Sequence, residues 1–442
     1  MSFLLADWRD RPTHRRVWAL AAPMILSNIS VPLVALVDST VIGHLPHAHQ
    51  LGAVAVGASL YIYLAWMMGF LRMGTTGFAA QAAGRGDGTA LRQILVQGLL
   101  LGLGLSLFLA AIALPFSRVA LSVMQPSAEL HDMTLAFFHN RLFGLPASLA
   151  SYALVGWFLG AQNARAPLAI LLTTNLMNIA LNLWFVLGLD WGVVGSARAS
   201  VIAEWSGALL GLWLTRGALR AYPGKMAWAA LRVWQNWKPL LGVNRDIFIR
   251  SLLLQSVFFA ITVQGARLGD ATVAANALLL NGLLLTAHAL DGLAHAVEAL
   301  CGHAIGARDR TALRRSMVVA CGWSLFASAL FALLFLLGGH WFVEMQTDIA
   351  SVRETAFQYL PYLAVLPLIA VWSYLLDGLF IGATRAREMR NAMLLSVAIA
   401  FPVAWALQGD GNHGLWISFL LFMVLRSGIL GLYATRIRWF TS

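Results

Sequence analysis

Long apolar runs recur along nearly the whole chain, and they constrain its fold more than any other feature. The chain has 442 residues, of which 60% are hydrophobic and only 11% are charged. Soluble domains carry about 25% charged residues, and they keep a polar shell that this chain could not supply. A bilayer-spanning helix needs ~20 mostly apolar residues, so a chain of this length has room for about a dozen. We therefore predict an all-α integral membrane protein with twelve transmembrane helices.

The twelve predicted helices follow from the positions of the apolar runs. They cover roughly residues 17–43, 51–80, 92–115, 134–161, 167–189, 193–215, 240–267, 272–304, 314–338, 354–383, 390–407 and 413–435. Several exceed the minimum length, which indicates tilt or extension beyond the hydrocarbon. The first run is long, holds two prolines and is not followed by a small-residue cleavage site, so we expect it to be retained as a helix.

The basic residues predict how the chain is oriented in the membrane. Cytoplasmic loops are enriched in Lys and Arg, and here most of the 30 Lys and Arg lie at the N-terminus and in every second connection. The opposite connections clearly hold only Arg118 and Arg353. We therefore expect both termini of this multi-pass protein to be cytoplasmic. The net charge of +11 then reflects topology, and we expect no nucleic-acid partner.

Two sequence matches indicate an internal duplication. Residues 84–92 match residues 306–314, and residues 160–166 resemble residues 382–388, both at an offset of 222 positions. Because that offset is half the chain, the matches predict two six-helix repeats, which share one orientation since six is even. The predicted domains are an N-terminal lobe (1–215), a basic cytoplasmic linker (216–239) and a C-terminal lobe (240–442).

Asp38 is the first candidate functional residue. It lies in an apolar run six residues after Pro32, and ionisable residues inside a membrane are expensive and usually functional. Burial disfavours the charged carboxylate, so Asp38 is a candidate for carrying protons across the membrane. Pro32 removes a backbone donor and predicts a hinge. The alternative is a carboxylate satisfied locally by Ser39 or Thr40.

A stripe of amides marks the fifth predicted helix. Asn175, Asn178 and Asn182 follow spacings of three and four, which place them on one helix face. Such a stripe could line a cavity and bind a carboxyl group, a cation or a substrate. Asn side chains also bond neighbouring helices in membranes, and the sequence leaves both interpretations open.

The eighth predicted helix carries a second polar stripe, formed by His288, Asp291, His295 and Glu298. It could relay protons, form an ion pair with Arg250, or bind a metal, although one helix face rarely completes a metal site. Asp377 is a further acid within a span. Arg198 is a candidate partner of Glu204.

Other features bear on enzyme chemistry. The sequence has no phosphate-binding loop of the Walker type, and its two cysteines, Cys301 and Cys321, suggest no disulfide framework. We predict a transporter rather than an enzyme, with no cofactor and no resident metal.

Ordered motifs along the chain resemble the DinF-like branch of the MATE (multidrug and toxic compound extrusion) family. The first runs from Pro23-Met-Ile-Leu-Ser-Asn-Ile-Ser-Val-Pro32 to the segment around Asp38. The others are residues 70–77, 244–247, 289–298 and 376–385. The resemblance implies a V-shaped pair of six-helix lobes that exports cationic or amphipathic compounds, driven by entry of protons or sodium. It also implies a location in the inner (plasma) membrane.

The same resemblance assigns roles to individual residues. It makes Asp38 the coupling carboxylate of the N-terminal lobe and Ser200 a hydroxyl beside it. Relatives carry a second carboxylate where this chain has Asn182. Asp377 matches an acid of the sodium-coupled branch, but the helix-7 acid of that branch has no counterpart between Arg250 and Asp270. Proton coupling is therefore preferred over sodium coupling, because an isolated carboxyl suits a proton better than a cation that needs several oxygens.

Two further functions stay open on the sequence. One is a flippase for a lipid-linked or polysaccharide precursor, with Arg72 and Arg250 as candidate phosphate ligands. The other is an intramembrane metalloenzyme that uses the stripe at 288–298. The sequence does not name the substrate. We expect small-molecule substrates, surrounding membrane lipid and a monomer, because a two-lobed carrier needs no second copy.

Overall fold

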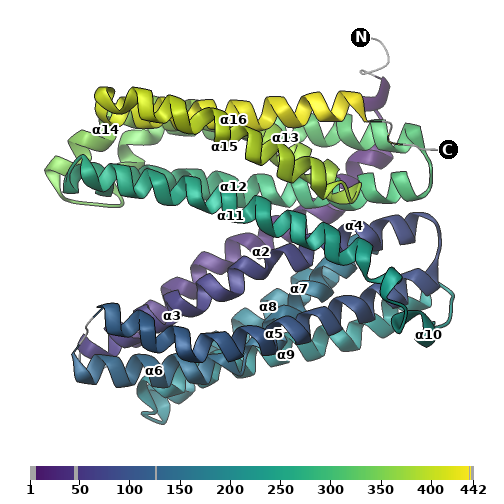
Figure 1. The fold of residues 1–442 in the computed structure, drawn as a ribbon, viewed down its shortest axis with the longest axis horizontal. Coiled ribbons are helices and arrows are strands. Elements are labelled where there is room, and N and C mark those ends of the chain that lie inside the picture. The colour runs from purple at the N-terminus through teal and green to yellow at the C-terminus, as the bar shows by residue number, and fades with distance from the viewer. Residues whose placement is uncertain (1–5, 44–47, 125–126, 438, 440–442) are drawn as a thin grey trace. The chain divides into compact units, whose positions relative to one another are not determined.

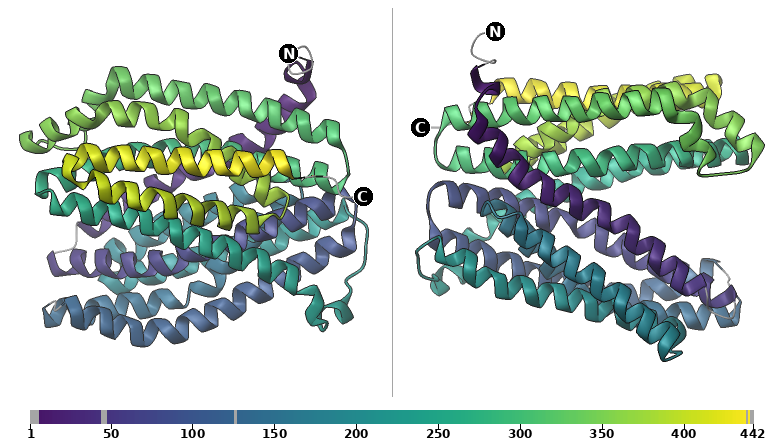
Figure 2. Two further views of the ribbon diagram at one scale, coloured as in Figure 1. Left: turned by 45° about the horizontal axis from the view of Figure 1, so that its top comes forward. Right: turned by 180° about the vertical axis from the view of Figure 1, so that it is seen from behind.

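The chain folds into long helices joined by short connections (Figures 1 and 2). The structure is a computed structural model that describes residues 6–43, 48–124, 127–437 and 439. Within these ranges the side chains of residues 31–39, 42–43, 48–49, 120 and 123–124 lie outside the description. Every regular element in the described ranges is helical, which confirms the all-α prediction.

Each of the twelve predicted spans coincides with one helix or with two or three consecutive helical segments. The first six are α2 (Arg11–Gly43), α3 (Ala48–Trp66) with η1 (Met67–Gly69) and α4 (Phe70–Gly84), α5 (Gly88–Met124), α6 (Ala128–Leu142) with α7 (Leu145–Gly160), α8 (Arg165–Asn182) with η2 (Leu183–Gly188), and α9 (Gly192–Arg220). After α10 (Trp228–Leu231) and η3 (Trp234–Asn236) come α11 (Lys238–Arg267), α12 (Asp270–Gly306), α13 (Arg310–Glu344), α14 (Ala350–Gly382), α15 (Ala386–Ala406), η4 (Leu407–Asp410) and α16 (Gly411–Arg436).

Eight helical segments in the described chain are long and apolar enough to cross a membrane, or nine if the bent pair α6 and α7 counts as one span. This number is below twelve partly because α15, η4 and α16 count together as the single segment Ala386–Arg436. The predicted span at 134–161 is not one straight helix, since α6 and α7 meet at 46°.

Contacts divide the chain into two compact units. One comprises Leu26–Leu240, here called the N-terminal unit, and the other comprises Met1–Ile25 with Leu241–Ser442, here called the C-terminal unit. The units differ from the predicted lobes at the start of the chain, because residues up to Ile25 pack with the C-terminal unit. The predicted linker (216–239) lies within the N-terminal unit. Inside the N-terminal unit α4 packs on α7 and α8 on α9, whereas α14 packs on α12 and α13 in the C-terminal unit.

The internal duplication is visible in the backbone of the two units. The connection after α4 turns through Gly86 (φ 68°), and the connection after α12 turns through Arg308 (φ 56°). The next repeated turn uses Gln162 (φ 63°) and Thr384 (φ 56°). Both pairs are separated by the 222 positions of the sequence repeat. Helices commonly end at a residue in the left-handed conformation, and this residue is usually glycine. Three of these four positions adopt the left-handed conformation with a residue other than glycine.

Close helix packing repeats at the same offset. A Cβ added at Gly156 or Gly160 of α7 would meet backbone atoms of α4, and one added at Gly378 or Gly382 of α14 would meet backbone atoms of α12. The carbonyls that would be struck belong to Arg72, Thr76, Ala294 and Glu298. Glycines spaced by four let membrane helices approach closely. Each unit is therefore built around one glycine-lined helix crossing.

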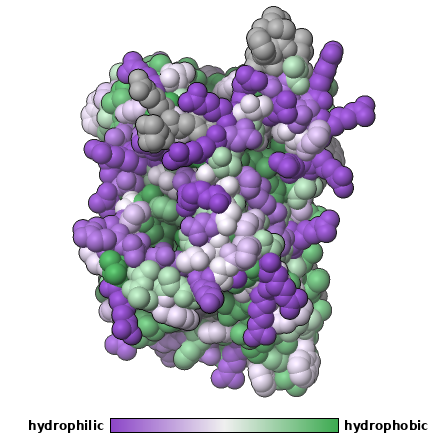
Figure 3. Space-filling view, turned by 90° about the vertical axis from the view of Figure 1, so that its right-hand side faces the viewer, coloured by the Kyte–Doolittle hydropathy of each residue, from purple (hydrophilic) through white to green (hydrophobic). Residues whose placement is uncertain are grey.

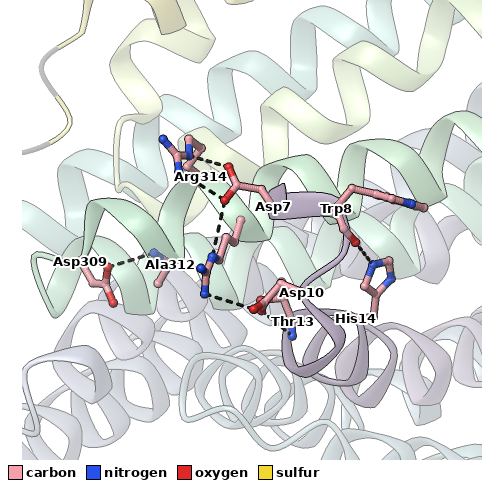
Figure 4. A network of polar contacts seen from close by, with 9 residues as sticks. Asp7, Trp8, Asp10, Thr13, His14, Asp309, Ala312 and Arg314 are labelled. Carbon is pink, nitrogen blue, oxygen red and sulfur yellow. Dashed lines mark hydrogen bonds and ion pairs between the residues drawn. The ribbon is translucent and has the colours of Figure 1, made fainter. Parts of the chain in front are cut away.

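The segment from Asp7 to His14 docks on α13, as Figure 4 shows. Arg314 contacts the buried carboxylate of Asp7 with an N–O distance of 2.6 Å, and Arg315 contacts Asp10 at 3.1 Å. The ring of His14 lies between the carbonyl oxygen of Trp8 (2.5 Å) and the indole N–H of Trp323, which donates to His14 Nδ1 (2.9 Å). We call this set of contacts the N-terminal clasp. It explains why the first residues belong to the C-terminal unit.

Many hydrophilic side chains lie on the face drawn in Figure 3, which includes the end of the C-terminal unit where α2 begins. The start of α2 and the connection between α12 and α13 both lie at this end (Figure 1). Arg11, Arg15 and Arg16, on the first turns of α2, are exposed there. A membrane-spanning unit needs such a polar end where its helices leave the hydrocarbon.

Candidate functional site

The predicted amide stripe on α8 forms a hydrogen-bonded chain inside the N-terminal unit. Asn178 is buried and donates to the hydroxyl of Ser200 on α9 at 2.9 Å. Asn182, fully buried, donates to the side-chain oxygen of Asn178 at 3.1 Å. Asn175 donates to Ser30 of α2 at 2.7 Å. The structure thus brings Ser200 to the stripe and ties three helices together.

A π-helical turn follows this stripe directly. The segment η2 begins at Leu183, one residue after Asn182, and ends at Gly188. Single π turns inside helices are uncommon and often occur at functional sites. Here the wider turn changes the helical phase just beyond the last amide. Residues beyond η2 therefore do not lie on the helix face that carries the three asparagines.

Asp38 and Pro32 lie on α2, and their side chains are outside the described residues. The backbone continues as a helix through both positions. Asn175 bonds to Ser30 on the same helix, so the α8 stripe faces α2 in the part of the helix that is described. The proton-coupling role of Asp38 stays a prediction.

A second polar cluster of the N-terminal unit was not predicted. Glu204 of α9 forms an ion pair with Arg141 of α6 at 2.8 Å, and the exposed fractions of the two side chains are 14% and 11%. The hydroxyl of Tyr61 donates to the same carboxylate at 3.2 Å, and the Arg141 guanidinium stacks 3.9 Å from the Tyr61 ring centre. Gly144 leaves room for the acid, because a Cβ there would collide with Glu204.

The expected pairing of Arg198 with Glu204 is wrong. Arg198 instead donates to Asn140 at 3.4 Å. The two positions are six apart, which does not put them on one helix face, and Arg141 reaches the acid from another helix. Arg141 and Glu204 can be noticed in the sequence as charged residues within apolar runs. Nothing in the sequence indicates that they form an ion pair with each other.

The main charged cluster of the C-terminal unit surrounds Asp377 of α14. One carboxylate oxygen of Asp377 accepts from both Arg250 of α11 and Arg426 of α16. All three side chains are buried, with exposed fractions of 9%, 8% and 4% respectively. Asp291 of α12 also interacts electrostatically with Arg250. Two guanidinium groups thus surround one carboxylate, and a cation at this oxygen would meet two positive charges.

The polar stripe on α12 is spread over several environments. His295 and Glu298 are buried, whereas His288 and Asp291 are partly exposed. A ring nitrogen of His288 lies 2.8 Å from the Leu284 carbonyl one turn earlier. Arg250 takes Asp377 as its ion-pair partner, so the predicted pairing with the stripe is limited to its interaction with Asp291. Among the described residues no three His, Cys, Asp or Glu lie close enough to hold a metal ion.

Comparison with known proteins gives a consistent family. The family model described as MatE matches residues 23–184 and 247–406. DNA damage-inducible protein F of Escherichia coli (strain K12) is 45% identical over 416 residues, which cover 94% of this chain and 90% of that protein. Multidrug resistance protein PmpM of Pseudomonas aeruginosa is 25% identical over 438 residues, covering 92% of this chain and 88% of that protein.

Solved structures agree with the fold. A crystal structure of MATE in the bent conformation matches with a TM-score of 0.85 at 17% identity, covering 99% of this chain and 97% of that one. A crystal structure of MATE in complex with MaD3S matches with a TM-score of 0.85 at 18% identity, covering 96% of each chain.

Proposed function

Because the chain belongs to the MatE family, whose members are transporters, we propose that it exports cationic or amphipathic small molecules in exchange for protons. The relative from Pseudomonas aeruginosa is named as a multidrug resistance protein, which supports drugs and toxic compounds as the class of cargo. The family membership makes this chain a transporter rather than an enzyme.

The environment of Asp377 favours protons over sodium as the coupling ion. A sodium ion needs several oxygen ligands, and the acid of this chain that matches the sodium-coupled branch is Asp377. Its carboxylate already accepts from Arg250 and Arg426, so a bound cation would have to compete with two buried positive charges. This observation is the main support for our preference for proton coupling. It leaves Asp38 as the candidate for the residue that couples transport to the proton gradient.

The amide stripe supports the same assignment. Asn178 and Asn182 present neutral groups that can donate to and accept from a carboxyl or a substrate. If Asp38 alternates between its charged and neutral forms, a neutral partner surface tolerates both. In this proposal Asp38 exchanges the proton, Pro32 is a hinge of α2, and Asn175, Asn178, Asn182 and Ser200 line the cavity of the N-terminal lobe.

We also propose the inner membrane as the location, with both termini in the cytoplasm and a monomer as the working form. The concentration of basic residues at the end where α2 starts supports this orientation. The flippase alternative loses one of its two candidate phosphate ligands, because Arg250 is in an ion pair with Asp377.

Transport in proteoliposomes tests the proposal. An imposed pH gradient should drive uptake of a fluorescent lipophilic cation, whereas an imposed sodium gradient should not. Asp38→Asn should abolish the proton-driven uptake, and Asp132→Asn is a matched control because the Asp132 side chain on α6 is 84% exposed. Uptake driven only by sodium, or full activity of Asp38→Asn, would refute proton coupling through Asp38.

A further inference from the structure

The C-terminal unit contains a cavity that the transport proposal does not use. Its volume is about 410 Å³, within the ~300–1,000 Å³ range of small-molecule sites. It lies between α11, α15 and α16, and its walls are mainly apolar and aromatic, including Phe401, Trp405 and Phe419. The residues Phe401 and Trp405 are 61% and 69% exposed, so the cavity is open at the surface of the unit.

The polar groups of the cavity lie mostly at one end. Arg267 is the last residue of α11, and Gln408 follows α15 just before α16 begins. Gln264 lines the cavity one turn before Arg267. None of the described residues that line it is acidic, and Arg267 forms no salt bridge within the described chain, although Asp270 follows it by three positions in the sequence. This end of the cavity therefore offers a cation and two amides to a negatively charged group.

The depth of the cavity matches one leaflet of a bilayer. Its lining extends along α11 from Arg267 back to Ser256, which is about 16 Å at 1.5 Å per helical residue. The hydrocarbon core is ~30 Å thick, so one leaflet contributes about half of that. A slot that starts at the ends of three helices and runs inward this far has the length of an acyl chain.

We propose that this cavity binds a membrane phospholipid with an acidic headgroup. The headgroup phosphate lies against Arg267 with the amides beside it, and one acyl chain fills the apolar slot. Trp405 is the next-to-last residue of α15, and tryptophans near the ends of membrane-spanning helices commonly contact headgroups. The lipid is a bound ligand, distinct from exported cargo, and the proposal does not depend on which ion drives transport.

Lipid titration of the purified full-length protein, followed by native mass spectrometry, tests the site. The probes are phosphatidylglycerol and phosphatidylcholine with identical acyl chains. Wild type should bind the first phosphatidylglycerol about tenfold more tightly, as expected for a charged hydrogen bond. Arg267→Gln should reduce this preference to near unity. Arg220→Gln is the matched control, because Arg220 is likewise an exposed arginine at the end of a helix but lies outside the cavity.

A second variant tests the slot itself. Ala404 lines the cavity, and Ala404→Phe should weaken binding of both phospholipids several-fold while leaving the preference for the acidic one. An unchanged preference in Arg267→Gln, or unchanged affinities in Ala404→Phe, would overturn the proposal. Octyl phosphate provides the last arm, because it carries the phosphate without a leaflet-length chain. Binding of octyl phosphate as tight as that of phosphatidylglycerol would identify a site for small amphipathic anions and refute the lipid assignment.

Discussion

Removal of the Asp377 carboxylate should damage the C-terminal unit more than removal of either arginine that it binds. Asp377 accepts from both Arg250 and Arg426, and all three side chains are buried. Asp377→Asn leaves two guanidinium groups facing each other with little compensation. Arg426→Gln, in contrast, leaves Asp377 and Arg250 as one neutral pair.

The structure sets the size of each effect. Breaking a buried ion pair by removing one partner costs about 3–5 kcal/mol, since the remaining charge stays buried. We expect Asp377→Asn to lie in this range or above it, because two charges are left. Arg426→Gln loses one hydrogen bond between charged groups, which contributes about 1.5–3 kcal/mol. The double variant Asp377→Asn with Arg426→Gln should be less destabilised than the sum of the two single variants, because only Arg250 is left and Asp291 lies near it.

The free energy of unfolding can be measured by titrating the purified protein with sodium dodecyl sulfate in mixed micelles. A double-mutant cycle gives the coupling between positions 377 and 426 directly. Arg198→Gln is a suitable control, because Arg198 is exposed and makes a long hydrogen bond to Asn140 (3.4 Å) and a distant cation–π contact with Trp191 (5.7 Å) rather than a buried ion pair. Additive effects within ~0.5 kcal/mol, or a smaller loss for Asp377→Asn than for Arg426→Gln, would refute the description of one acid shared by two bases.

Three further predictions concern the rest of the molecule. Glu204→Gln should destabilise the N-terminal unit by about 3 kcal/mol in the same titration, because Arg141 stays buried without its partner; a loss no larger than that of Asp132→Asn would contradict this. Gly160→Ala should cost about 1–3 kcal/mol, because the added methyl group meets the α4 backbone, whereas Gly104→Ala, with open space around it, should be neutral or stabilising. The pKa of Asp10 is lowered, chiefly by the hydrogen bond from the Thr13 side chain and further by the Thr13 backbone and Arg315, against an opposing effect of burial. Its contribution to the N-terminal clasp should therefore be present above the unfolded pKa of about 3.9 and be lost as pH falls through the lower folded pKa. Asp10→Asn should remove that part of the acid dependence of stability, and an unchanged pH profile would argue against it.

The fold could be predicted from the sequence because its main determinants are local. Each apolar run had to become a helix, and the 222-residue offset reappears in the backbone at Gly86 and Arg308. Packing that depends on distant partners was harder to predict. Asp377 was recognised as an intramembrane acid, but its partners lie 127 and 49 positions away on other helices.

The candidate site shows the same limit. Helical spacing placed the three asparagines of α8 on one face, and the link from Asn178 to Ser200 agrees with the resemblance. The bond from Asn175 to Ser30 spans 145 positions, and the pair of Arg141 and Glu204 spans 63. The spacing of residues along one helix does not reveal contacts between residues of different helices. The prediction for Arg198 was wrong because it chose Glu204 as the partner for its closeness in the sequence. The actual partners are set by how the helices pack.

The N-terminal clasp has a consequence for the synthesis of the protein. Asp7 leaves the ribosome well before its partner Arg314, which follows 307 positions later. At ~5–20 residues per second, about 15–60 seconds pass before Arg314 has been made. During that interval the Asp7 carboxylate lacks its ion-pair partner. This carboxylate is almost completely buried in the finished protein. Formation of the clasp thus joins a segment made early to a helix made much later. A protein truncated before α13 would present that unpaired segment to the quality-control machinery of the cell.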